Sequence, residues 1–304
     1  MKLHDFLTKN CTDADLVTLM GKIIPEAVKK VRMVIEEDVQ GMAGSMNSSG
    51  EQQLALDVRA NQIVIDTLGE SKLVGHMASE ELENEVVYDQ NNPPFTVVFD
   101  PLDGSSLVDV NMAVGSIFGV YAVGSALGKT GDDQLAACYA VYGPRTTFVL
   151  TLRNGVHEFR LEKDGEFYLR KENLKVAEES KYFAPGNLRA ASERADYVAL
   201  MTEWMKRKLT LRYSGGMVPD VNHIFLKGSG VFVYPGYSEA PQGKLRILFE
   251  AAPFALIMEE AGGAASDGSQ RVLSKPITEL HQRTPIYLGS KNEIERVVGA
   301  LAVL

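Results

Sequence analysis

The chain has 304 residues, of which 45% are hydrophobic and 23% charged, a composition typical of a globular protein large enough for two domains. Its 40 acidic and 31 basic residues give a net charge of −9, which argues against a nucleic acid or an anionic membrane as partner. Two cysteines are too few for a disulfide framework, and no apolar signal segment opens the chain, so we expect a cytoplasmic protein.

Two helices are expected near the beginning of the chain. Apolar residues recur at helical spacing over 13–37, where Thr12 or Asp13 is the expected N-cap, and again over 51–68. Between these helices, residues 41–50 are rich in Gly, Ser, Asn and Met and lack periodicity. This composition indicates a mobile loop or a linker.

Short apolar runs separated by turn residues then predict a sheet. The run 95–99 ends at Asp100-Pro101, where proline is expected to end the hydrogen bonding of the strand. The uncharged stretch 110–128 contains four glycines and is better explained as two buried strands joined by turns than as a membrane helix. Further strands are expected over 72–78, 136–142, 146–152, 156–161 and 167–169, the last two forming a hairpin at the sheet edge.

The composition becomes more polar after Glu172, and we place a domain boundary near Lys175. The expected domains are 1–175, which carries most of the acidic candidates discussed below, and 176–304. In the second domain we expect helices over 195–208, 219–227 and 253–261, and strands over 231–234 and 244–249.

Acidic residues recur at or beside the ends of these apolar segments: Glu80 and Glu81, Asp100 and Asp103, Glu250, and Asp57 within its helix. In α/β proteins, ligands gather at the carboxyl ends of strands. The turn Gly104-Ser105-Ser106 follows Asp103 and offers amide groups and hydroxyls to an anion. Carboxylates beside such a turn suit Mg²⁺ that bridges to a phosphate. Each acidic pair alone is also explained as a solvated turn.

Basic and aromatic residues gather after the boundary: Arg189, Arg212, Tyr213, Tyr234, Lys244 and Arg246. Their donors are the kind that a second phosphate, away from the metal, would need. Because no Ser–His or Cys–His arrangement is evident, a covalent enzyme intermediate is not indicated. The helix expected to open at Pro253 would direct its positive end toward Glu250.

These motifs resemble the class 1 fructose-1,6-bisphosphatase family, within the lithium-sensitive sugar and inositol phosphatases. The resemblance lies in Ser79-Glu80-Glu81, in 99–106, in 243–246 and in Phe249-Glu250. The strings 183–190 and 210–222 are most similar to the sedoheptulose-1,7-bisphosphatases of this family. The resemblance covers nearly the whole chain and implies a layered α/β/α/β/α fold, with the metal site at the interface of two domains.

The resemblance also implies roles for individual residues. Two or three Mg²⁺, or Mn²⁺ in their place, would be bound by Glu80, Glu81, Asp100, the Leu102 carbonyl, Asp103 and Glu250. Asp57 and Glu81 would orient the attacking water and accept its proton, while Gly104, Ser105 and Ser106 would hold the reacting phosphate. The distal phosphate and the sugar would contact Asn187, Tyr213, Tyr234 and Lys244.

The family further implies a homo-oligomer, a dimer or a tetramer, in which Arg212 reaches a neighbouring subunit's site. Glu51 of the mobile loop would meet Arg246 when that loop closes. Ala184 stands where fructose-specific members have Asn, and Glu239 stands where the family has Lys, although Tyr234-Pro235 matches the fructose enzymes. The expected substrate pocket therefore combines features of the fructose-specific enzymes with departures from them.

The expected activity is hydrolysis of the 1-phosphate of fructose-1,6-bisphosphate, of sedoheptulose-1,7-bisphosphate, or of both. One alternative is an inositol monophosphatase-like or nucleotide 3′-phosphatase, although those enzymes carry Trp-Asp where this chain has Phe249-Glu250. The other alternative is a non-catalytic phosphosugar-binding protein in which the acidic residues serve only to bind the ligand.

Overall fold

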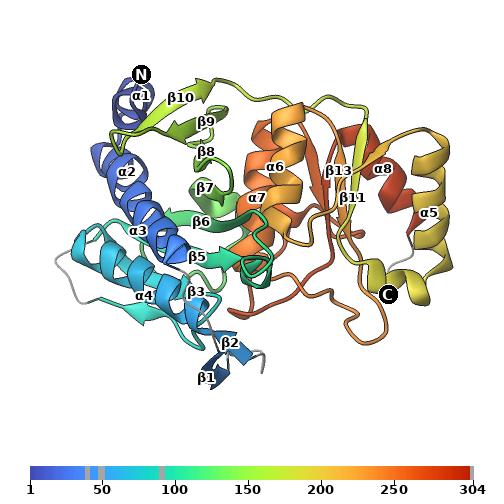
Figure 1. Cartoon of the computed structure of the whole chain (residues 1–304), viewed down its shortest axis with the longest axis horizontal. Coiled ribbons are helices and arrows are strands. Elements are labelled where there is room, and N and C mark those ends of the chain that lie inside the picture. Colours follow the sequence, from blue (N-terminus) through green and yellow to red (C-terminus); the bar gives the residue numbers. More distant parts are fainter. Residues whose placement is uncertain (38–41, 47–51, 89–92, 302–304) are drawn as a thin grey trace.

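The computed structural model describes residues 1–37, 42–46, 52–88 and 93–301. Within these ranges, helices and sheets alternate in five layers (Figure 1). Helices α1 to α4 cover one face of an eight-stranded sheet, α6 and α7 fill the space between this sheet and a five-stranded one, and α5 and α8 lie on the far side. The expected layered α/β/α/β/α architecture is therefore confirmed.

The first layer contains α1 (Leu3–Asn10), α2 (Ala14–Thr18), α3 (Ile24–Glu36) and α4 (Ala55–Glu70), with a π-helical turn at Leu19–Ile23 between α2 and α3. Asp13 caps α2, since its Oδ1 accepts the amides of Asp15 at 3.0 Å and Leu16 at 2.9 Å. The helix expected over 13–37 is thus confirmed, with one wider turn inside it.

The prediction of an unstructured segment over 41–50 is wrong in part. Residues Met42–Met46 form β1, which pairs antiparallel with β2 (Gln52–Leu54), so α4 begins at Ala55 rather than at Glu51. The pairing is made by backbone groups and needs no alternation of apolar side chains, which is why the composition did not indicate it. The remainder of that segment, with Glu51, lies outside the described residues.

The eight-stranded sheet has the order β10-β9-β8-β7-β6-β5-β3-β4. Its strands are β3 (Val74–Ser79), β4 (Val86–Val87), β5 (Phe95–Asp103), β6 (Val114–Ala122), β7 (Gln134–Tyr142), β8 (Thr147–Thr151), β9 (Val156–Leu161) and β10 (Phe167–Lys171). Strands β3 and β5 run parallel, so their carboxyl ends meet at the same edge of the sheet. The hairpin of β9 and β10 forms one side of the sheet, with β10 as an outermost strand and β4 as the other, as expected.

Two predictions about the centre of this sheet are wrong. Strand β5 does not stop at Pro101 but continues to Asp103, and its register against β6 shifts between Asp100 and Asp103. Pro101 lies within this bulge, where a missing amide proton is tolerated. The stretch 110–128 holds one strand, β6, rather than two. Its Gly115 permits close packing instead of a turn, because a Cβ there would lie 2.3 Å from Val218 of α6.

The five-stranded sheet has the order β12-β11-β13-β15-β14. Its strands are β11 (Tyr182–Pro185), β12 (Thr210–Leu211), β13 (Val231–Tyr234), β14 (Ala264–Ser266) and β15 (Ile286–Gly289). The helices of the second half are α5 (Ala195–Lys206), α6 (Met217–Lys227), α7 (Ala252–Glu260) and α8 (Lys291–Ala300). The ring of Tyr139 in β7 packs on Phe225 of α6 and Phe254 of α7, with centroids 5.9 Å and 4.9 Å away. One apolar core thus spans the expected boundary near Lys175, and the division into two domains stays a prediction.

The strand expected over 244–249 is absent from the described structure. Residues Ile247–Ala251 instead form a π-helical turn that continues into α7. The alternation of Leu245, Ile247 and Phe249 imitated a strand, but Leu248 between them is fully buried as well, so this segment is apolar on all sides. The N-terminal, positive end of the helical segment that carries Glu250 therefore lies before Ile247 and not at Pro253. No described helix is long and apolar enough to cross a membrane.

Candidate active site

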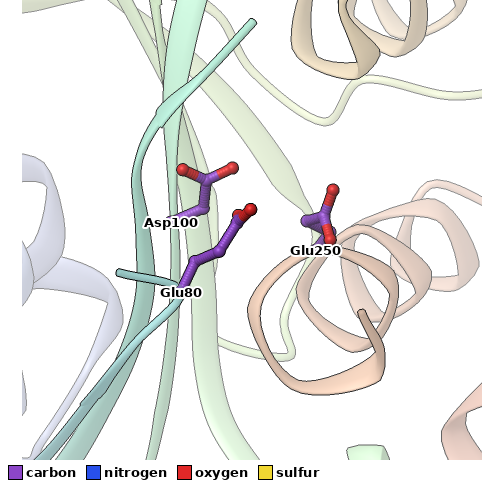
Figure 2. Close-up of side chains that lie close together, drawn as sticks. All are labelled: Glu80, Asp100 and Glu250. Carbon is purple, nitrogen blue, oxygen red and sulfur yellow. The ribbon is translucent and has the colours of Figure 1, made fainter. Parts of the chain in front are cut away.

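Three carboxylates converge between the end of the eight-stranded sheet and the π-helical turn (Figure 2). They belong to Glu80, directly after β3, to Asp100 in β5 and to Glu250, and each offers an oxygen within 4.8 Å of the others. Asp100 and Glu250 are buried and Glu80 is partly buried. Because the three come from segments far apart in sequence, folding alone assembles this set of oxygen ligands. Such a set fits a divalent cation.

Burial and mutual repulsion make this carboxylate cluster unfavourable without a cation. Burial raises the pKa of Asp100 well above its usual range, and the charges of Glu80, Asp103 and Glu250 raise it further. Burial and then Glu80 likewise raise the pKa of Glu250. The guanidinium of Arg246 partly balances the charge, with its Nη1 2.5 Å from Glu80 Oε1.

The bulge of β5 and the beginning of α6 fix Asp103 beside the cluster. The Val218 amide in the first turn of α6 donates to Asp103 Oδ2 at 2.7 Å, and the Leu102 amide donates to Asp100 Oδ1 at 2.9 Å. Burial raises the pKa of Asp103 to about 7, an effect that the Val218 amide opposes. One side of Asp103 thus faces the cluster and the other is held by a helix N-terminus.

The turn after Asp103, predicted to bind an anion, begins with a glycine in a left-handed conformation. Gly104 has a φ of 78°, a left-handed conformation that favours glycine, and Ser105–Leu107 form one turn of 3₁₀ helix. A Cβ on Gly104 would lie 3.5 Å from the Cα of Gly216, so this turn packs against the glycine turn before α6. Ser105 is partly buried and Ser106 is exposed beside the carboxylates.

Helix α4 supports the turn that carries Glu80 and Glu81. Asp57, in its first turn, is buried, and Asn61 lies one helical turn further along the same face. The hydroxyl of Ser79 donates to Asn61 Oδ1 at 2.6 Å and accepts the Glu81 amide at 3.2 Å. Sequence reasoning singled out Asp57 and Glu81 but missed Asn61 and Ser79, although the spacing of Asp57 and Asn61 was a usable signal.

Tyr234, the last residue of β13, is near enough to Glu250 of the carboxylate cluster for that charge to affect its hydroxyl. Burial raises the pKa of Tyr234 to about 12; the charge of Glu250 raises it further, while that of Arg189 opposes the shift. Tyr213 is exposed and Lys244 is partly buried. The roles of Tyr213, Tyr234 and Lys244 in holding a distal phosphate stay predictions.

Two other predicted substrate contacts lie in different surroundings. Asn187 is buried, and its Nδ2 donates to the Pro235 carbonyl at 2.9 Å, so its amide joins the segments after β11 and β13. Arg212 is exposed, donates to the Leu211 carbonyl at 2.8 Å and lies over the ring of Tyr182. Arg246 pairs with Glu80, and its predicted meeting with Glu51 falls outside the described residues.

Further polar residues that the sequence did not single out shape the site from behind. Ser116 of β6 donates to the Pro101 carbonyl at 2.7 Å and lies 2.8 Å from the Tyr142 hydroxyl, which fixes the bulge. Asp220 in α6 accepts the Ser214 amide at 2.8 Å and so closes the turn that follows Tyr213. A serine or an acid within an apolar strand or helix was the available signal for both.

Comparisons with known proteins agree over nearly the whole chain. Residues 10–172 match the family model described as "Fructose-1-6-bisphosphatase, N-terminal domain", and 176–302 match the C-terminal domain. The chain is 43% identical over 299 residues to the chloroplastic sedoheptulose-1,7-bisphosphatase of Triticum aestivum, covering 97% of this chain and 75% of that protein. It is 42% identical over 296 residues to the class 1 fructose-1,6-bisphosphatase of Syntrophotalea carbinolica, covering 96% and 91%. The crystal structure of Leishmania major fructose-1,6-bisphosphatase in holo form matches with a TM-score of 0.91 at 32% identity, covering 97% of each chain.

Proposed function

Because the chain belongs to the fructose-1,6-bisphosphatase family of sugar-bisphosphate phosphatases, we propose that it hydrolyses the 1-phosphate of both fructose-1,6-bisphosphate and sedoheptulose-1,7-bisphosphate. The observation that carries this proposal is the carboxylate cluster of Glu80, Asp100 and Glu250 beside the turn that begins at Gly104. The cluster provides ligands for a cation, and the turn provides donors for a phosphate. Family membership favours this activity over an inositol monophosphatase-like or nucleotide 3′-phosphatase activity.

The metal in this proposal is Mg²⁺, with Mn²⁺ as a substitute, because the donor set consists of hard oxygen atoms. Two or three ions would be bound by Glu80, Glu81, Asp100, the Leu102 carbonyl, Asp103 and Glu250. When bound, such ions would neutralise phosphate charge and lower the pKa of a bound water, which would make that water easier to deprotonate for attack on phosphorus. The raised pKa values of Asp100 and Glu250 agree with a site that expects a cation.

The chain's own groups then have separate tasks. Asp57 and Glu81 orient the water and accept its proton; Asp57 is buried in the first turn of α4, and the Ser79 hydroxyl accepts the main-chain amide of Glu81, which follows Glu80 of the cluster. The turn Gly104–Ser106 binds the reacting phosphate through backbone amides and hydroxyls. Asp103, fixed by the Val218 amide, keeps this turn and the cluster in register.

At the other end of the site, Tyr213, Tyr234, Lys244 and Asn187 hold the sugar and the distal phosphate, and Arg246 lies between the two ends. Arg212 serves the site of a neighbouring subunit in a dimer or tetramer, which agrees with its exposed position. Ala184 is buried in β11 and offers no polar group there, so the pocket lacks one donor that fructose-specific members have. We therefore expect sedoheptulose-1,7-bisphosphate to be accepted as well as the fructose compound.

The first test is phosphate release from each bisphosphate with Mg²⁺ and with a chelator, using wild type and Asp103→Asn. We expect Mg²⁺-dependent release from both compounds, and a loss of about 100-fold or more in kcat for Asp103→Asn with the fold retained. Asp109→Asn is the matched control, because Asp109 is an exposed acid nearby and should leave kcat unchanged. Release that persists in chelator would refute the metal mechanism, and binding without turnover in wild type would identify a phosphosugar-binding protein.

A further inference from the structure

One histidine contacts both of the segments that carry the carboxylate cluster. His281 lies between α7 and β15, and its Nε2 is 2.8 Å from the Leu82 carbonyl, 199 residues earlier in the chain. Leu82 follows Glu80 and Glu81 directly. The imidazole also contacts the ring of Phe249, at a centroid distance of 5.4 Å and an angle of 53°. Phe249 immediately precedes Glu250 in the π-helical turn.

The contact with Leu82 fixes the protonation of one ring nitrogen, Nε2. A carbonyl oxygen can only accept, so Nε2 must carry a proton and donate it to Leu82. Burial lowers the pKa of His281, which favours the neutral imidazole in this position. The ring therefore forms a neutral link, with a hydrogen bond on one side and an apolar contact on the other.

The backbone around His281 is anchored to the π-helical turn rather than to the Glu80 turn. The Ile247 amide donates to the Gln282 carbonyl at 2.8 Å, and the Thr284 amide donates to the Leu245 carbonyl at 3.0 Å. His281 thus extends from a segment that is hydrogen-bonded to the π-helical turn carrying Glu250, and it reaches across to the turn that carries Glu80.

A second link joins the same two segments, but it involves a charge. Arg246 Nη1 lies 2.5 Å from Glu80 Oε1. A cation bound between Glu80 and Glu250 would compete with this guanidinium for the Glu80 carboxylate. The hydrogen bond of His281 is made to the main-chain carbonyl of Leu82 instead, so the same cation would not compete with it. The neutral link is thus suited to hold the two segments when the cation binds.

We propose that His281 is a positioning residue that sets the separation of Glu80 and Glu250 and thereby the affinity of the site for a divalent cation. This inference rests on the proposed metal site. In this proposal His281 is not itself a metal ligand and acts through its contacts with Leu82 and Phe249. Residues that orient metal ligands from behind typically change metal affinity or activity about 10- to 100-fold when replaced.

The test compares His281→Phe, which keeps an aromatic contact with Phe249 but loses the donor, with His281→Gln, which keeps a donor but loses the ring. Mn²⁺ binding is measured by calorimetry on the full chain without substrate, and the Mg²⁺ concentration for half-maximal phosphate release is measured with saturating bisphosphate. We expect His281→Phe to weaken Mn²⁺ binding about tenfold or more and to raise the half-maximal Mg²⁺ concentration in proportion. KM at saturating Mg²⁺ should stay within threefold of wild type, and His281→Gln should restore part of the affinity.

His4→Gln is the matched control, because His4 lies in α1 away from the cluster and should not change Mn²⁺ binding. The proposal is overturned if folded His281→Phe binds Mn²⁺ as wild type does. It is also overturned if its melting temperature in chelator falls while metal affinity is unchanged, since that result describes a purely structural residue. Should His281→Phe fail to fold, unchanged Mn²⁺ affinity in His281→Gln together with normal Mg²⁺ activation overturns it. A wild type that binds no Mn²⁺ refutes the metal site itself, which is a separate outcome.

Discussion

The substitution Gly115→Ala examines whether the spacing between the eight-stranded sheet and α6 controls the site. A Cβ at residue 115 would lie 2.3 Å from Val218 Cγ1 and 2.5 Å from the Ala140 carbonyl oxygen. Since carbon atoms pack at about 3.5–4.0 Å, the helix and the strand would have to separate by roughly 1 Å. Val218 is the residue whose amide holds Asp103 at 2.7 Å, so the same displacement acts on the carboxylate.

We expect Gly115→Ala to lower the free energy of unfolding by about 2–3 kcal/mol, as overpacking of a buried strand does. The loss of kcat/KM should be about 100-fold, because a shift of 1 Å in a positioned group has effects of that order. Denaturant unfolding gives the first quantity, and phosphate release at a temperature where the variant remains folded gives the second.

Two further variants separate this explanation from a general weakening of the fold. Gly115→Ala with Val218→Ala removes Cγ1 and should recover part of both losses, although the approaches to the Ala140 carbonyl at 2.5 Å and to the Cβ of residue 218 at 2.7 Å remain. Gly299→Ala in α8 makes the same change where a Cβ meets nothing within 4 Å, and it should stabilise the chain by about 0.5–1 kcal/mol without changing kcat. A Gly115→Ala enzyme with wild-type kcat/KM and unchanged stability would refute the link between helix spacing and Asp103.

Two predictions concern polar groups that hold the second half of the chain. Burial raises the pKa of Glu293, but hydrogen bonds from Arg207 and Trp204 lower it more, so the net pKa is below its usual value. A carboxyl group whose pKa is depressed in the folded state stabilises the fold above its unfolded pKa of about 4.3, and this stabilisation is lost as pH falls through the folded pKa. Glu293→Gln should therefore lower the free energy of unfolding at pH 7 by about 1–3 kcal/mol. Denaturant unfolding should show this difference from wild type shrinking below about pH 4. Asp220→Ala should raise KM about tenfold with a smaller change in kcat, because the Ser214 amide then loses its acceptor next to Tyr213. Asp220→Asn should recover much of this KM, and an unchanged KM in Asp220→Ala would contradict the positioning role.

The acidic candidates could be predicted because local sequence placed them. The parallel strands β3 and β5 lead to Glu80, directly after β3, and to Asp100, within β5, and the apolar runs before these residues predicted both positions. The turn after Asp103 could be predicted for the same reason, because a left-handed backbone conformation at residue 104 favours glycine, which the sequence has there. The helix over 13–37 was predicted from periodicity and a cap, which depend on neighbouring residues alone.

Glu250 was found in the sequence for a wrong structural reason. It was expected at the end of a strand, and it lies in a π-helical turn that is buried on all sides. Alternation cannot distinguish these structures when every residue of the segment is buried, because periodicity reports only the contrast between a buried and an exposed face. The bulge at Pro101 was missed because its partner hydroxyl comes from Ser116 on the neighbouring strand.

The sequence by itself determined the chemical groups of this phosphatase and the strand and turn that present the first of them, because those depend on interactions between near neighbours. The tertiary structure decided which groups meet. Val218 reaches Asp103 across 115 residues of chain and His281 reaches Leu82 across 199, through packing that brings α6 and the π-helical turn onto the eight-stranded sheet. Such contacts depend on the burial of whole surfaces against one another, and no local pattern records them.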